Sequence, residues 1–284
     1  MSASDPDAQR AESAERWDRA AVGWGRMADQ VRAFGMPVSA WMIEHAELQP
    51  GQRVLELAAG PGDTGFMAAE LIKPGGTLVS SDMSAGMLDI ARQRAHAQGI
   101  DNVEFAELSL EWIDLETASV DTILCRWGIM LVPDPEAAVR EMRRVLRPGG
   151  RVAVAVWDEA SLNPWATIPD RALRELGLTQ PPEPGSPGMF VLAPASRLQD
   201  LLEAAGFVEV EVQSVSLERP SADLDAFVAY TSELSAAFSA AISGLDESGR
   251  ERLGRRIAEL AKPFAQPDGS LTFPGRSLAA AASA

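Results

Sequence analysis

The sequence predicts an α/β fold, in one elaborated domain, with a mostly parallel seven-stranded sheet that carries helices on both faces. N-terminal helices and a helical lid are expected in addition. Three observations lead to this class: short apolar runs alternate with helix-length segments, a glycine-rich turn follows the first apolar run, and glycines or prolines separate the segments. Parallel strands need long crossovers, so this alternation favours a parallel sheet.

The N-terminal part divides into a tail and helices. Residues 1–14 are small, polar and acidic without an apolar period, and they predict a disordered tail. Apolar residues recur at helical spacing over residues 17–46, which predicts two or three helices. We expect residues 15–157 to form these helices together with the core of the sheet.

The core alternates strands and helices in order. Strands are predicted by short apolar runs that follow turn residues. The expected strands are 53–58, 77–81, 103–107, 120–126 and 151–157. The expected helices between them are 64–72, 85–98 and 135–146.

The second half departs from this rhythm. Residues 158–190 hold five prolines between Pro169 and Pro187 and predict a lid insertion, a helix plus a long loop over the sheet. Residues 191–284 are expected to complete the sheet around a helical insertion. Within them the pattern predicts a helix over 194–205, a strand over 207–217, a helical segment over 223–260 and a last edge strand over 270–284.

Composition limits the partners. A net charge of −16 disfavours nucleic acid, because such a surface repels phosphate. No apolar run approaches the roughly 20 residues that span a bilayer, and the N-terminus has no signal pattern, so a cytoplasmic location is expected. The single cysteine, Cys125, allows no internal disulfide and no thiolate metal cluster, and no metal site is predicted.

The turn after the first strand is the most informative segment. Glu56 ends the apolar run, and Gly60 and Gly62 precede a helix whose free N–H groups can meet a polar ligand. A ligand is therefore expected at this turn. Gly60, Gly62 and Gly65 also satisfy the G-x-G-x-x-G pattern of nicotinamide-binding enzymes, so the glycines alone leave the ligand open.

The surrounding residues resemble the class I S-adenosylmethionine-dependent methyltransferases, which have a Rossmann-like fold. Glu56, Gly60 and Gly62 match the first motif of that family, with Ala58 where the family usually has glycine. Asp82, after the second strand, matches the carboxylate that binds the ribose hydroxyls. Residues 125–135, 146–150 and 205–207 look like the ubiquinone/menaquinone-biosynthesis type of small-molecule methyltransferase, and the resemblance covers about residues 50–217.

The resemblance implies S-adenosyl-L-methionine as cofactor, with Met83 on the adenine and Ser109 where the family often has an acid. The residues expected to bind the cofactor are Glu56, Ala58, Gly60, Gly62, Asp82, Met83, Ser109, Leu110, Arg126 and Trp24. Two alternatives stay open: Arg126 pairs with a core carboxylate, and Trp24 only packs.

Substrate contacts are expected at the carboxyl edge of the sheet and in the helical segments. The residues expected there are Trp127, Trp157, Trp165 and Tyr230, with core packing as the alternative reading of each. No general base is predicted, because His45 lies on a helix before the first strand and His96 lies on the polar end of a helix. The apolar and aromatic lid favours methyl transfer to a small hydrophobic or aromatic metabolite.

Two other functions stay open. A nicotinamide-dependent oxidoreductase would be expected to carry a Tyr-x-x-x-Lys pair, yet Leu234 stands four residues after Tyr230, the only tyrosine. A non-catalytic protein that binds S-adenosylmethionine is the second alternative. Titration with S-adenosylmethionine, its demethylated product and NADH separates these readings.

Overall fold

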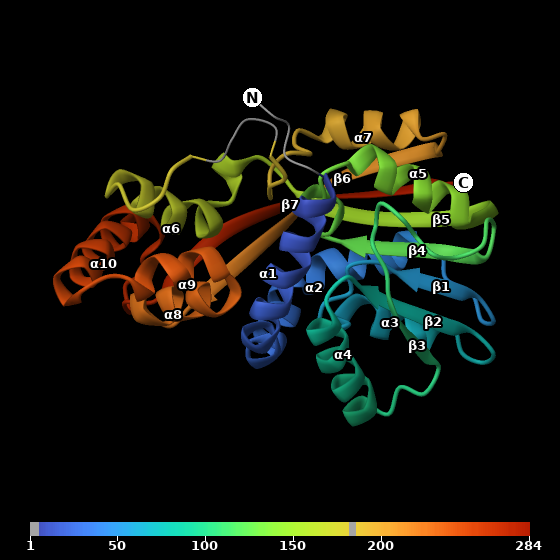
Figure 1. Cartoon of the computed structure of the whole chain (residues 1–284), viewed down its shortest axis with the longest axis horizontal. Helices are drawn as coiled ribbons and strands as arrows, with labels where there is room; N and C mark the ends of the chain where they lie inside the picture. Colours follow the sequence, from blue (N-terminus) through green and yellow to red (C-terminus); the bar gives the residue numbers. More distant parts are fainter. Residues whose placement is uncertain (1–5, 182–185) are drawn as a thin grey trace.

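The computed structural model describes residues 6–181 and 186–284, and residues 6–9 by their backbone only. It confirms the predicted class, a seven-stranded sheet in the order β3-β2-β1-β4-β5-β7-β6 with helices on both faces (Figure 1). β7 is antiparallel to both of its neighbours, and the first five strands are parallel. The strands are β1 (Arg53–Glu56), β2 (Thr77–Asp82), β3 (Val103–Glu107), β4 (Val120–Arg126), β5 (Leu146–Trp157), β6 (Val208–Ser221) and β7 (Leu271–Ser283).

The helices begin where polar side chains can cap them. Ser84 accepts a hydrogen bond from the Met87 N–H, and Asp134 accepts one from the Ala137 N–H, so two crossover helices start directly after these residues. The helices are α1 (Pro6–Arg26), α2 (Ala28–His45), α3 (Asp63–Leu71), α4 (Ala85–Gln98), α5 (Pro135–Val145), α6 (Pro164–Glu175), α7 (Ala195–Ala204), α8 (Leu224–Leu234), α9 (Ala236–Ser243) and α10 (Glu247–Ala261). None of the helices in the described ranges is long and apolar enough to cross a membrane.

The described residues form two apolar cores. The larger core lies between the sheet and its flanking helices and is built from apolar side chains of all five parallel strands and β7. The smaller core joins α6, α8, α9 and α10 to the far part of β7, around Phe227, Ile257 and Phe273. We call this second unit the helical lobe. The long strands β6 and β7 connect it to the sheet (Figure 1).

The N-terminal tail was predicted too long. Residues 1–5 lie outside the described residues, but residues 6–14 belong to α1, so the expected disorder is wrong for them. Arg10 forms an ion pair with the almost buried carboxylate of Glu111, 3.0 Å from Nε to Oε2. This contact joins residues 101 positions apart, which explains why local composition did not reveal it.

Two further expectations concern the second half. The strand near the C-terminus is not an edge strand: β7 lies between β5 and β6, and its alanines 279–282 are buried from both sides. The edge position belongs to β6, whose residues are largely exposed. The helix of the predicted lid, α6, packs against α10 and β7 in the helical lobe rather than over the sheet, and residues 182–185 of that lid lie outside the described residues.

Candidate functional site

The glycine-rich turn has an unusual backbone. Ala58, Gly60 and Gly62 all have left-handed φ values, of 50°, 52° and 89°. Glycine adopts left-handed φ values without strain, whereas a residue with a Cβ is strained there. Ala58 is therefore the strained position of the turn. A Cβ on Gly60 would meet nothing within 4 Å, and a Cβ on Gly62 would lie 2.4 Å from the Phe66 ring. The turn therefore leaves open space beside Gly60 and closes tightly against α3.

Glu56 is buried directly beneath this turn. Its carboxylate accepts hydrogen bonds from the Gly65 N–H at 2.7 Å and from the Ser80 hydroxyl at 3.2 Å. Burial raises the pKa of Glu56 to about 7, against the lowering effect of the Gly65 N–H. A Cβ on Gly65 would lie 2.1 Å from a Glu56 oxygen, so glycine is needed there for α3 to pack against β1.

Asp82 stands one strand away, at the end of β2. It accepts hydrogen bonds from the Gly60 N–H at 2.9 Å and from the Ser84 N–H at 3.0 Å, and it is 8% exposed. Burial raises its pKa, and the two N–H donors oppose this effect. The carboxylate thus ties the glycine-rich turn to the second strand and still reaches the cavity described below.

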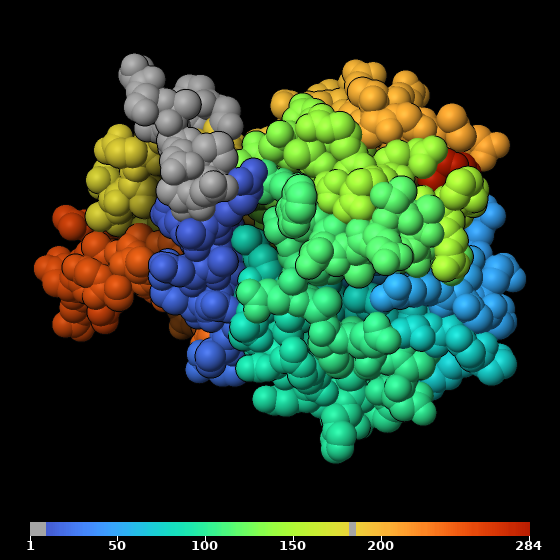
Figure 2. All heavy atoms as spheres, turned by 45° about the vertical axis from the view of Figure 1, so that its right-hand side comes forward, coloured from blue at the N-terminus to red at the C-terminus, as the bar shows by residue number. Residues whose placement is uncertain are grey.

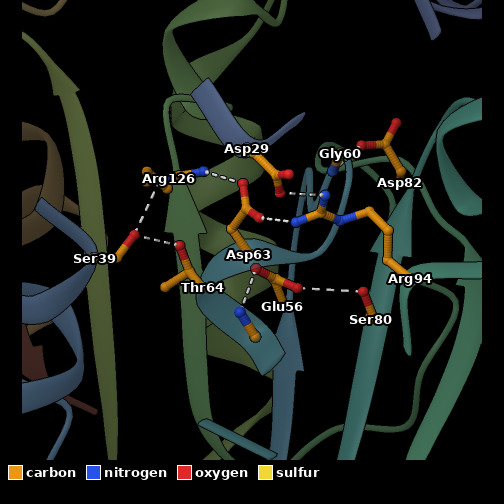
Figure 3. A network of polar contacts seen from close by, with 11 residues as sticks. Asp29, Ser39, Glu56, Gly60, Asp63, Thr64, Ser80, Asp82, Arg94 and Arg126 are labelled. Atoms are coloured by element: carbon orange, nitrogen blue, oxygen red, sulfur yellow. Dashed lines mark hydrogen bonds and ion pairs between the residues drawn. The ribbon is translucent and has the colours of Figure 1, made fainter. Parts of the chain in front are cut away.

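Arg126, at the end of β4, pairs with a core carboxylate, which is one of the alternatives that sequence reasoning left open. Its guanidinium pairs with Asp63 at 3.4 Å and donates to the Ser39 hydroxyl at 3.0 Å. Asp63 also pairs with Arg94 at 2.7 Å, and Arg94 reaches Asp29 on α2 (Figure 3). The network links α2, α3, α4 and β4 while Arg126 still lines the cavity.

One cavity lies at the carboxyl edge of the sheet, between β1, β2, β4 and α1, and we call it the carboxyl-edge cavity. Of the residues expected to bind a cofactor, it brings together Trp24, Glu56, Ala58, Gly60, Asp82, Met83, Ser109, Leu110 and Arg126. Gly62 does not line it and instead precedes α3 as its cap. The predicted cofactor residues are thus neighbours in space, although they come from five segments of the chain.

Apart from Trp24, the α1 side of this cavity was missed by sequence reasoning. Arg10, Ser13 and Trp17 line it together with Trp24, and α1 lies between the helical lobe and the sheet (Figure 2). Their spacings of three, four and seven residues place all four on one helical face. The spacing of Trp17 and Trp24, extended back by one and by two helical turns, would have found Ser13 and Arg10.

The predicted substrate residues divide into two groups. Trp127 lines the cavity and stacks on Trp157 with ring centroids 4.1 Å apart. Trp165 meets Trp157 edge to face at 4.9 Å, and Phe34 from α2, which sequence reasoning did not single out, packs among all three. We call these four residues the aromatic cluster. Tyr230 is not in the cavity wall and lies in the helical lobe.

The side chains present fit an adenosyl sulfonium. Asp82 offers a carboxylate for vicinal hydroxyls, and Met83 and Leu110 offer apolar surface for a flat ring. Glu56 offers a buried carboxylate for a positive group, and the open space at Gly60 allows close approach of a ligand. These features define a Rossmann-like α/β domain with a ligand cavity where the carboxyl ends of its parallel strands meet.

Comparison with known proteins identifies the domain more closely. Residues 48–175 match a protein family described as a methyltransferase domain. This part of the chain is a methyltransferase domain, and the family implies S-adenosylmethionine as its cosubstrate.

Individual proteins are also similar to this chain. An uncharacterized protein of Mycobacterium tuberculosis is 34% identical over 131 residues, 46% of this chain and 45% of that protein. The ubiquinone/menaquinone biosynthesis C-methyltransferase UbiE of Hahella chejuensis is 37% identical over 114 residues, 39% of this chain and 45% of that protein. The chain thus spans somewhat under half the length of these relatives. The solved structure of YcgJ from Bacillus subtilis shares the fold, with a TM-score of 0.57, 20% identity, and coverage of 86% of this chain and 97% of that one.

Proposed function

We propose that the protein transfers the methyl group of S-adenosylmethionine to a small molecule with a hydrophobic or aromatic surface. The observation that carries the proposal is the continuity of the carboxyl-edge cavity with the aromatic cluster, through Trp127. The polar end of the cavity, around Glu56 and Asp82, suits the cosubstrate. The aromatic end suits an apolar acceptor.

The residues have separate tasks in this proposal. Asp82 holds the ribose hydroxyls, Met83 and Leu110 enclose the adenine, and Glu56 faces the positively charged end of the cosubstrate. When bound, S-adenosylmethionine supplies an electrophilic methyl carbon on its sulfonium. The protein's contribution is to hold the acceptor at this carbon and to exclude water, with Trp127 as the nearest wall of the aromatic cluster.

The first test is binding. Calorimetric titration of the full chain with S-adenosylmethionine, S-adenosylhomocysteine and NADH is expected to show binding of both sulfur compounds and none of NADH. Tight binding of NADH without a response to either sulfur compound would instead support a nicotinamide-dependent oxidoreductase.

The second test is transfer. Methyl-labelled S-adenosylmethionine is incubated with a panel of phenols, quinols and small charged amines, and labelled product is expected from the aromatic acceptors. Trp127→Ala should lose transfer at least tenfold, whereas Trp112→Ala, which removes a tryptophan that is 74% exposed, should not change it. Methylation of the small charged amines alone would contradict the proposed acceptor class. Cosubstrate binding without transfer to any acceptor would point to a non-catalytic binding protein.

A further inference from the structure

Arg219 on β6 is a buried cation without a matching anion. Arg219 is 5% exposed, and its Nη1 has no hydrogen-bond partner. Within the described ranges, no carboxylate forms an ion pair with it. Burial of an unpaired charge is costly, and burial lowers the pKa of this guanidinium. A protein with a net charge of −16 has many carboxylates that could have served as partners.

Two aromatic rings hold the guanidinium in place. Its Cζ lies 3.9 Å from the centroid of the Tyr230 ring and 5.2 Å from that of Phe227, both on α8. Aromatic faces attract a cation, but each such contact provides only about 0.5–2 kcal/mol, and the Nη1 donor of the guanidinium still has no hydrogen-bond partner. The rings therefore orient Arg219 without neutralising it.

This arrangement lies next to the carboxyl-edge cavity. The Trp24 indole N–H donates to the Leu234 carbonyl at the end of α8, at 3.3 Å, so α8 packs directly behind a cavity-lining residue. Burial raises the pKa of the Tyr230 phenol, and the charges of Arg219 and Arg126 both act against this rise. Arg126 lines the cavity, so the charge of a cavity-lining residue acts on Tyr230 as well as that of Arg219.

β6 connects the same place to the aromatic cluster. Leu217 is two residues before Arg219 and therefore lies on the same face of the strand. Leu217 pairs with Gly275 on β7. A Cβ on Gly275 would lie 3.1 Å from the Trp165 indole nitrogen and 3.5 Å from the Phe34 ring, so this part of β7 is next to the aromatic cluster. Along this face, the apolar surface of the aromatic cluster is thus followed by a single buried cation.

We propose that the methyl acceptor is an amphipathic acid, whose apolar body lies on the aromatic cluster and whose carboxylate binds Arg219, with the Tyr230 hydroxyl as a second donor. The proposal rests on the proposed function and adds the substrate class to it. One guanidinium matches the single charge of a carboxylate, and its planar edge matches the two carboxylate oxygens.

The test compares acids with their neutral amides. The full chain, saturated with S-adenosylhomocysteine, is titrated by calorimetry with 4-hydroxybenzoate, 3-phenylpropanoate and decanoate and with the corresponding amides. At least one acid is expected to bind tenfold or more tightly than its amide. Arg219→Met should abolish this preference without changing the affinity for S-adenosylhomocysteine, and Arg219→Lys should keep part of it. Arg255→Met, which removes an exposed arginine of α10, is the matched control and should change neither.

The outcomes are distinct. Equal binding of acids and amides, no detectable binding of any acid, or an acid preference that persists in Arg219→Met overturns this inference while the proposed function stands. Failure of S-adenosylhomocysteine to bind the unmodified chain overturns the proposed function itself.

A second measurement does not depend on the choice of acids. If Arg219 is kept for a ligand, Arg219→Met should raise the melting temperature of the unliganded protein, because a buried unpaired charge is replaced by an apolar chain of similar length. A lower melting temperature would show that the cation–π contacts make Arg219 a structural residue, and would contradict the inference.

Discussion

The carboxyl edge of the sheet and the helical lobe differ in how their carboxylates are buried and in which groups donate hydrogen bonds to them. At the sheet edge, Glu56 and Asp82 are buried and are held by backbone N–H groups, so their positions follow from the backbone. In the lobe, ion pairs are exposed and are made between side chains. Glu175 there accepts from Arg171 and Arg256, which lowers its pKa to about 2. Backbone donors thus fix the carboxylates at the sheet edge, whereas side-chain donors hold the carboxylate of Glu175 in the lobe.

The match to the methyltransferase family ends within the helical lobe. Residues 48–175 hold β1 to β5, the glycine-rich turn and α6 of the lobe, whereas α8, α9 and α10 lie outside the match. We infer that the sheet edge serves the cosubstrate and that the lobe, through β6 and α8, serves the acceptor. The following predictions test whether these two tasks are separable.

The largest effect is expected from core truncation in either region. Ile257→Ala in the lobe and Ile123→Ala in β4 both remove a fully buried side chain and should each lower the free energy of unfolding by about 2–5 kcal/mol. Denaturant unfolding measures this. Calorimetry should show that Ile257→Ala keeps its affinity for S-adenosylhomocysteine within twofold, whereas Ile123→Ala weakens it. A loss of affinity in Ile257→Ala would show that the two regions are not separable.

The next largest effect concerns Asp82. Asp82→Ala should weaken cosubstrate binding by about 1.5–3 kcal/mol, the scale for hydrogen bonds to a charged group. The control is Asp114→Ala, an exposed carboxylate on the loop before β4, which should leave the affinity unchanged. Unchanged affinity in a folded Asp82→Ala protein would remove Asp82 from the cosubstrate site.

Gly65 tests the packing that holds Glu56. Gly65→Ala places a methyl group within 2.1 Å of a Glu56 oxygen, so stability should fall by about 1–3 kcal/mol and cosubstrate affinity at least fivefold. Gly254→Ala on α10 is the matched change in the lobe, because a Cβ there meets nothing within 4 Å. It should raise stability by about 0.5–1 kcal/mol and leave binding alone. Equal effects of both changes would mean that the tight packing at Gly65 is not needed.

The smallest expected effect is the release of a fraction of a proton from Glu56 when the cosubstrate binds. Its pKa of about 7 lies above the ordinary value of 4.5, so the folded protein holds this proton more tightly than the unfolded chain does. Its contribution to stability is complete below pH 4.5 and is lost as the pH rises through 7. A positive ligand beside Glu56 favours the carboxylate, so binding at pH 7 should release about half a proton, measured by calorimetry in buffers of different ionisation enthalpy. Glu56→Gln should abolish the release, and proton uptake on binding would contradict this placement.

Sequence reasoning succeeded where local pattern determines structure. β3, β4 and α4 have the predicted bounds, and the predicted cofactor residues, Gly62 excepted, line one cavity because the ends of neighbouring parallel strands must meet. It failed where distant contacts decide. The first turns of α1 carry Arg10, which pairs with Glu111 about a hundred positions away, and Arg219 lies two residues past the predicted end of its strand. β6 continues through Pro220, which an edge strand tolerates because one side needs no hydrogen bond.

The position of β7 has a consequence for folding kinetics. β6 and β7 are antiparallel neighbours, so α8, α9 and α10 amount to an enlarged hairpin connection between them. The open side of β5 is closed only when Val154 pairs with Ala280, far along the chain. Such long-range pairing is slow, because loop closure must precede it. Until the chain through Ser283 has emerged, β5 presents an unpaired apolar edge, and shortened chains should aggregate through it.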